Sequence, residues 1–176
     1  MKKIILVLGT PLSGKKTQSK LLAESLNYKY VLMDDVIKSE IEGKTKIGLI
    51  AEKYINTNTP IPDEYYIMLI KDLVINLKQE GVIFCGFPKT IAQAKALDLF
   101  LFSRKNEKAI CVFLKLDPII TLSRFGSADE YRVKQNEFNL NSQPVVDYYS
   151  NNKIEIEALN KSNVELNNEI LKCISI

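Results

Sequence analysis

Short apolar runs alternate along the chain with longer segments in which apolar residues recur at helical spacing. A short run rich in β-branched residues and leucine is typical of a strand that is buried on both faces of a sheet. Such runs predict strands at 3–8, 28–33, 82–85, 109–114 and 153–157. The helical spacing predicts helices at 15–26, 47–55, 63–77, 90–102, 118–125, 129–149 and 164–173. A further helix is expected to begin at Asp34 or Asp35, either of which can act as its cap.

The order of these elements predicts an α/β fold. Each of the last three expected strands follows a helical stretch, and this alternation favours a parallel sheet with helices on both faces. We therefore expect a five-stranded parallel sheet. The chain has 176 residues, of which 46% are apolar, and it contains no internal repeat or long linker. We expect a single domain over residues 1–176.

Composition and charge restrict the partners and the compartment. The longest apolar runs, 4–8 and 109–114, are far shorter than the roughly 20 residues that cross a bilayer, so we expect no membrane contact. The net charge of +3 is modest and the lysines are mixed with acidic residues, which argues against a nucleic-acid partner. Three cysteines, two of them in apolar runs, argue against a disulfide framework. We expect a cytoplasmic monomer.

The chain contains no histidine at all. This absence excludes Ser/His/Asp and Cys/His catalysis, and it excludes every metal site built on imidazole. Any catalysis must therefore use lysine, arginine, aspartate and backbone groups.

The segment between the first strand and the first helix has the composition of a phosphate-binding loop. Its glycines allow successive N–H groups to point inward at phosphate oxygens, and the helix N-terminus adds positive potential. Lys15 would reach the outer phosphates. Thr17 is the candidate Mg²⁺ ligand, because Lys16 occupies the position where the general pattern has Ser or Thr. A plain turn between strand and helix is the alternative. The residues expected to bind the donor phosphates are Gly9, Pro11, Leu12, Ser13, Gly14, Lys15, Lys16 and Thr17.

Several motifs in order resemble those of one enzyme family. Gly9-x-Pro-x-x-Gly-Lys-x-Thr-Gln18 resembles the Gly-x-Pro-Gly-x-Gly-Lys-Gly-Thr-Gln loop of adenylate kinases. Further along, 62–64 reads Pro-Asp-Glu as in that family, and 85–90 resembles its Asp-Gly-Phe-Pro-Arg-Thr. Residues 143–149 resemble its Ala-Pro-Leu-Ile-Asp-Tyr-Tyr, so that the similarity spans 3–175.

This resemblance implies a P-loop nucleoside monophosphate kinase that moves the terminal phosphoryl group of ATP, with Mg²⁺, to a nucleoside monophosphate, with AMP favoured. It implies a helical monophosphate-binding insertion at 34–63 and a vestigial lid at 125–131. The acceptor-binding residues would be Asp35, Lys38, Pro60, Ile61, Gly86, Lys89 and Gln93. Catalysis would rest on Lys15, Lys89, Arg124, Arg132 and Lys134, and Asn160 would lie at the donor base.

The chain departs from the family pattern at charged positions. Lys38 and Lys89 stand where the family has arginines, and Cys85 replaces the aspartate that orients the water shell of magnesium. Asp34 stands at a glycine position of the family. The lid is very short, and Arg132 either substitutes for its missing arginine or pairs with Glu130 or Glu137 on a solvated helix face.

These departures leave other functions open. A catalytically degenerate member that binds nucleotide and acts as a sensor or interaction module would explain Cys85 and the two lysines. A P-loop kinase of another small acceptor is also compatible with the fold, because the fold alone does not fix the acceptor.

Overall fold

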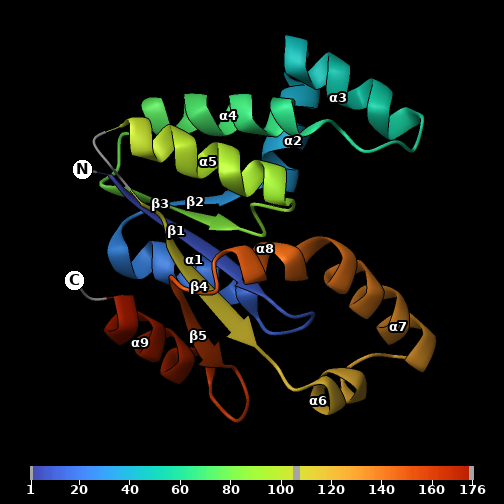
Figure 1. Ribbon diagram of the computed structural model, residues 1–176, viewed down its shortest axis with the longest axis vertical. Coiled ribbons are helices and arrows are strands. Elements are labelled where there is room, and N and C mark those ends of the chain that lie inside the picture. The colour runs from blue at the N-terminus through green and yellow to red at the C-terminus, as the bar shows by residue number, and fades with distance from the viewer. Residues whose placement is uncertain (1, 105–107, 175–176) are drawn as a thin grey trace.

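The computed structural model of the protein describes residues 2–104 and 108–174, and a parallel sheet lies at its centre (Figure 1). The strands lie in the order β2-β3-β1-β4-β5, and every neighbouring pair is parallel. The five-stranded parallel sheet expected from the sequence is thereby confirmed. The strands are β1 (Lys3–Gly9), β2 (Lys29–Leu32), β3 (Gly81–Cys85), β4 (Ile110–Lys115) and β5 (Lys153–Glu157).

Helices cover both faces of the sheet (Figure 1). Alternate residues of β1 point to opposite faces, as in any strand. Ile4, Leu6 and Leu8 join the core under α2 to α5 and α8, whereas Ile5 and Val7 pack against α1 and α9. The helices are α1 (Lys15–Leu26), α2 (Met33–Glu42), α3 (Lys46–Asn56), α4 (Asp63–Ile75), α5 (Ile91–Ser103), α6 (Pro118–Ser123), α7 (Ala128–Glu137), α8 (Gln143–Tyr148) and α9 (Asn163–Ile174).

Two predicted helices differ from those observed. The single helix expected at 129–149 is divided by a π-helical turn, Phe138–Ser142, which links α7 to α8. The cap expected at Asp34 or Asp35 was wrong, because β2 runs directly into α2 and Leu32 occupies the cap position with no side-chain hydrogen bond. Both aspartates lie instead in the first helical turn, where negative charge is still favourable.

The contact between α2 and α3 explains a glycine that is unfavourable inside a helix. A Cβ atom on Gly48 would lie 1.9 Å from the backbone oxygen of Glu40, so only glycine allows the two helices to approach so closely. The hydroxyl of Thr45 caps α3 by accepting from the N–H of Gly48 at 3.0 Å. The helical part of the 34–63 segment is therefore a tightly packed pair.

The parallel sheet brings the loops that follow β1, β3 and β4 to the same edge. The carboxyl ends of β3 and β4 flank that of β1, with Val7 opposite Cys85 and Gly9 opposite Leu114. Ligands of open α/β sheets bind outside such carboxyl ends. No helix in the described ranges, 2–104 and 108–174, combines the length and the apolar character that a membrane span needs.

Candidate active site

The predicted phosphate-binding loop joins β1 to α1 and is fastened to the neighbouring strand β4. The backbone N–H of Thr10 donates to the carbonyl of Leu114 at 3.1 Å, and the Thr10 hydroxyl accepts from the N–H of Leu116 at 3.0 Å. A Cβ atom on Gly9 would lie 2.5 Å from the hydroxyl oxygen of Ser13 and 2.7 Å from the Leu114 oxygen. The loop therefore folds tightly back over the end of β1, and only glycine fits at its start.

The middle of the loop has the features of an anion site. Leu12 and Gly14 both have positive φ, at 58° and 81°, and Pro11 precedes them in a partly buried position. The hydroxyl of Ser13 is buried and has no hydrogen-bond partner among the described residues. The helix that begins at Lys15 has no side-chain cap, so its first N–H groups have no partner from a capping side chain. An unpaired buried hydroxyl beside an uncapped helix N-terminus fits a bound phosphate.

Lys15 lies over this loop and is largely removed from water. Its ammonium group donates to the Thr10 carbonyl at 3.4 Å. Burial lowers the pKa of Lys15 below its ordinary value, and Lys16 lowers it further, whereas Cys85 and Glu137 act in the opposite direction. A phosphate group at the loop would stabilise the charged ammonium through its negative charge.

Cys85 forms the floor of the site at the end of β3. Its side chain is 1% exposed, and it influences both Lys15 and Tyr30. Burial, together with Cys85 and Asp35, raises the pKa of the Tyr30 phenol to about 12. The next residue, Gly86, has a φ of 66°, and no atom lies within 4 Å of where its Cβ would be. The floor thus carries a buried thiol, with open space above Gly86.

A partly buried hydrogen-bond network holds the loop between β3 and α5. The amide oxygen of Gln93 accepts from the N–H of Lys89 at 2.8 Å, and its amide nitrogen donates to Asp63 at 2.6 Å. The Thr90 hydroxyl donates to the other Asp63 oxygen at 2.7 Å. Gln93 is 1% exposed, and both ends of its amide are hydrogen-bonded, so it holds the loop in place.

The two acceptor lysines have unequal partners. The ammonium group of Lys89 donates to Asp34 at 2.7 Å across 55 residues of sequence. Lys38 lies 4.0 Å from Glu42, one helical turn further on in α2, and its side chain is 76% exposed. Lys38 is therefore held only loosely, whereas Lys89 is joined directly to α2.

The other predicted acceptor residues and the donor-base residue lie at the borders of this region. Pro60 is exposed and Ile61 packs partly against the core, both in the connection between α3 and α4. Asp35 lines a groove of about 740 Å³ between β2 and helices α2 to α4. Asn160 follows β5 with a φ of 56°, a left-handed conformation that asparagine tolerates.

The remaining predicted catalytic cations lie on α6 and α7. Arg124 is the exposed cap residue at the end of α6, three residues before Ser127 caps α7. Arg132 pairs with Asp129 at 3.6 Å, rather than with either glutamate considered from the sequence. Lys134 pairs with Glu137 at 3.0 Å. The segment predicted as a short lid, 125–131, thus comprises a tight connection and the first turn of α7.

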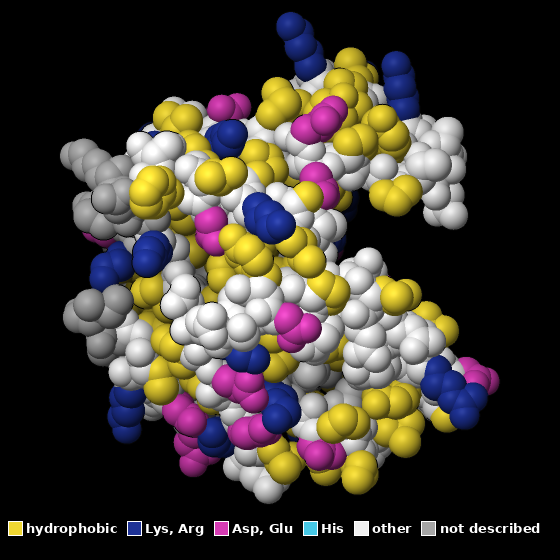
Figure 2. Space-filling view, viewed as in Figure 1, with side chains coloured by type: hydrophobic (Ala, Val, Ile, Leu, Met, Phe, Trp, Pro, Cys, Tyr) yellow, Lys and Arg dark blue, Asp and Glu magenta, His cyan; other side chains and the backbone are white. Residues whose placement is uncertain are grey.

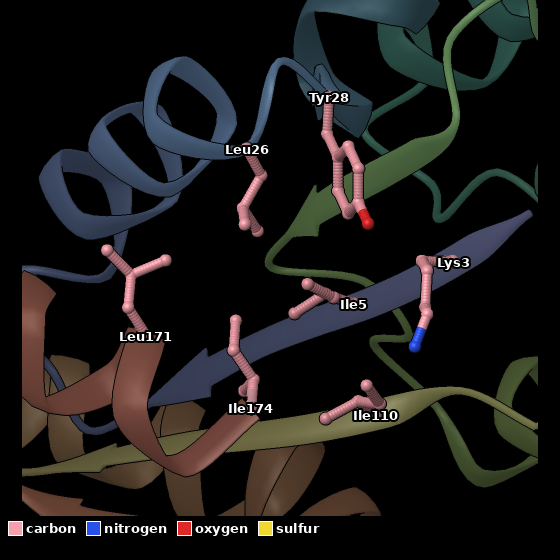
Figure 3. Close-up of a pocket in the computed structure, with 7 residues that line it drawn as sticks. All are labelled: Lys3, Ile5, Leu26, Tyr28, Ile110, Leu171 and Ile174. Carbon is pink, nitrogen blue, oxygen red and sulfur yellow. The ribbon is translucent and has the colours of Figure 1, made fainter. Parts of the chain in front are cut away.

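The molecule is hollowed on the side where β1 and β3 end. Figure 2 shows a notch there between the part formed by α2 and α3 and the part formed by α6 and α7. A smaller apolar pocket of about 180 Å³ lies at the opposite, amino edge of the sheet (Figure 3). It is lined by Lys3, Ile5, Leu26, Tyr28, Ile110, Leu171 and Ile174. The candidate site therefore belongs to the notch and not to this pocket.

Two features of the site were missed from the sequence. One is the Asp34–Lys89 ion pair, and the other is the use of Asp63 as a shared acceptor for Thr90 and Gln93. Both are contacts between residues far apart in the chain, and no local spacing indicates them. The only available signal was the unusual charge of Asp34 at a position where the resembling loops have glycine.

Fold and site together define a P-loop phosphotransferase. The first loop has glycine near both ends, lies between a buried parallel strand and an uncapped helix, and has a lysine over it. This arrangement binds nucleotide phosphates. A second loop with a lysine follows the adjacent strand and faces the same notch. The class is that of the nucleoside monophosphate kinases.

Comparison with known proteins gives the family. The family model described as "Adenylate kinase" matches residues 7–154. The chain is 32% identical over 162 residues to the adenylate kinase of Flavobacterium psychrophilum, covering 85% of each chain. It is 34% identical over 171 residues to that of Azobacteroides pseudotrichonymphae, covering 90% of each. The chain belongs to the adenylate kinase family and is a nucleoside monophosphate kinase.

The substitution Asp63→Asn tests the network that holds the Lys89 loop. An amide at this position places an N–H donor against the donors of Thr90 or Gln93, so we expect the free energy of unfolding to fall by about 1–3 kcal/mol. The matched control is Glu64→Gln, which removes the neighbouring acid from the same helical turn but is exposed. Denaturant unfolding should show the loss for Asp63→Asn alone; equal losses in both variants would mean that only the helix terminus is affected.

Proposed function

We propose that this protein transfers the terminal phosphoryl group of ATP to a nucleoside monophosphate, with AMP as the preferred acceptor. The observation that carries the proposal is the adjacency of two lysine-bearing loops, one after β1 and one after β3, at neighbouring ends of paired parallel strands. Such a pair of loops suits two phosphate chains that meet end to end. The names of the relatives, all adenylate kinases, support AMP as acceptor.

In this proposal the donor phosphates lie on the first loop. Lys15 and the N–H groups at the start of α1 neutralise the charge that spreads over the transferring group, which is where most of the catalytic effect of such enzymes arises. Lys89, and Lys38 on α2, attract the acceptor phosphate. Arg124, Arg132 and Lys134 approach the donor from α6 and α7, and Asn160 lies beside its base.

Lysine at positions 38 and 89 affects how the acceptor phosphate is oriented. An ammonium group is a strongly hydrated point charge on a flexible stem, whereas a guanidinium group presents a planar fork that matches phosphate. Lys38 and Lys89 therefore attract the acceptor phosphate without fixing its orientation. The expected result is binding comparable with arginine-bearing relatives but slower transfer.

The site fits magnesium that is carried by the nucleotide. Among the described residues no group of three or more His, Cys, Asp or Glu side chains could hold a metal ion. The Thr17 hydroxyl is exposed on the first turn of α1 and is the proposed protein ligand, with phosphate oxygens and water completing the shell. When bound, Mg²⁺ would neutralise phosphate charge. The Cys85 thiol, being soft and buried, adds no hard oxygen.

A coupled assay with ATP and each of AMP, CMP, UMP, GMP and dTMP tests the proposal. We expect the fastest diphosphate formation with AMP, and a loss of at least about a hundredfold in Lys15→Met, because the charge on the transferring phosphoryl would then be uncompensated. Lys95→Met, on the exposed face of α5, is the control that should retain the parent rate. Absence of transfer to all five acceptors at high enzyme concentration would contradict the proposal.

Restoring a carboxylate at the floor of the site should strengthen magnesium use. We expect Cys85→Asp to raise transfer, or lower the Mg²⁺ concentration for half-maximal rate, by about tenfold, because it supplies a hard acceptor for metal-bound water. The neighbouring Lys15 offsets the buried charge. Cys85→Asn, of similar shape but uncharged, is the control. An equal gain in both variants, or none in a folded Cys85→Asp protein, would exclude this role for position 85.

A further inference from the structure

An ion pair joins the acceptor loop to the helical segment beside it. Asp34 lies in the first turn of α2, Lys89 lies in the loop after β3, and the carboxylate oxygen is 2.7 Å from the ammonium nitrogen. The side chains are 62% and 45% exposed. The contact therefore lies at the surface, where a ligand has access to both groups.

The surroundings of Lys89 are acidic. Asp63 lies in the same network through Gln93 and Thr90, and both Asp34 and Asp63 act on the phenol of Tyr66 on α4. Burial raises the pKa of Tyr66, Lys89 opposes this shift, and the two aspartates add to it. Asp34 contacts the Lys89 ammonium group directly, and Asp63 lies nearby in the network below it, so the attraction of Lys89 for a phosphate is reduced.

We propose that Asp34 sets the affinity for the acceptor monophosphate by neutralising Lys89, so that the incoming phosphate must displace this carboxylate or bind beside it. The inference rests on the proposed function in one respect, namely that Lys89 binds the acceptor phosphate. Asp34 is the residue whose carboxylate contacts the Lys89 ammonium group, so it is the group that we expect to determine acceptor affinity.

The exposure of the Asp34–Lys89 ion pair determines whether Asp34 affects acceptor affinity or the maximal rate. Ion pairs between exposed side chains are held weakly, so a phosphate dianion can displace the carboxylate. The effect should then appear in acceptor affinity and not in the maximal rate. Lys38, 4.0 Å from Glu42 and more exposed, carries no comparable restraint, and Lys15 contacts a backbone carbonyl. Donor affinity should therefore be insensitive to Asp34.

The test is Asp34→Asn, which keeps the shape of the side chain and removes its charge. We expect the calorimetric Kd and the KM for AMP to fall about tenfold, because like-charge repulsion at the phosphate disappears. The KM for ATP should stay within about twofold, since the donor loop lies on another strand. Adenosine, which lacks the phosphate, should bind equally to parent and variant.

Control variants separate the outcomes. Asp72→Asn makes the same chemical change on exposed α4 and should leave AMP binding unaltered. Lys89→Met should weaken AMP binding, and equal AMP binding in that variant would overturn the assignment of Lys89. Unchanged or weaker AMP binding in Asp34→Asn, or an equal gain for ATP or adenosine, would overturn the proposal. Because binding is measured by calorimetry, a parent enzyme without turnover would contradict the proposed function but leave this result interpretable.

Discussion

The site depends on the parallel pairing of β1 with β3 on one side and β4 on the other. These buried strands fix where their carboxyl ends lie, and so they fix the distance between the loop that begins at Gly9 and the loop that begins at Gly86. Hydrogen bonds from Thr10 to β4 and from the N–H of Gly86 to Val7 at 3.2 Å extend the sheet into both loops. The two loops are thus parts of one rigid edge, and rigidity at this edge is what transfer between two bound phosphates requires.

Charge is distributed unevenly over this edge. Three of the proposed cations, Lys89, Arg132 and Lys134, each have a carboxylate partner within 4 Å. Lys15 instead contacts a backbone oxygen, and burial lowers its pKa, so a bound anion would favour its charged form. The donor loop is therefore prepared for an anion, whereas Lys89, Arg132 and Lys134 must exchange one anionic partner for another.

Local sequence patterns predicted the framework but not the contacts that cross it. Strand and helix periodicity predicted the sheet and most helix boundaries to within two residues, because burial on two faces or along one stripe leaves a regular apolar pattern. The loop of Gly9 to Thr17 was recognisable because its chemistry is local. The contacts of Asp34 and Gln93 could not be predicted, because Lys89 and Asp63 are brought near them only by the tertiary fold. The close approach of Glu40 to Gly48 likewise has no local signal. The π-helical turn after α7 likewise leaves no periodic signature.

The central claim is that both loops bind nucleotide phosphates at the same time. A bisubstrate analogue with two adenosines joined through a phosphate chain tests this claim most directly, because a ligand that binds only the folded state raises the unfolding temperature by mass action. The account predicts a larger shift for this analogue than for ATP at the same concentration, with the difference lost in Lys89→Met. A shift no larger than that of ATP would mean that only the Gly9 loop binds nucleotide, and it would contradict the two-site account.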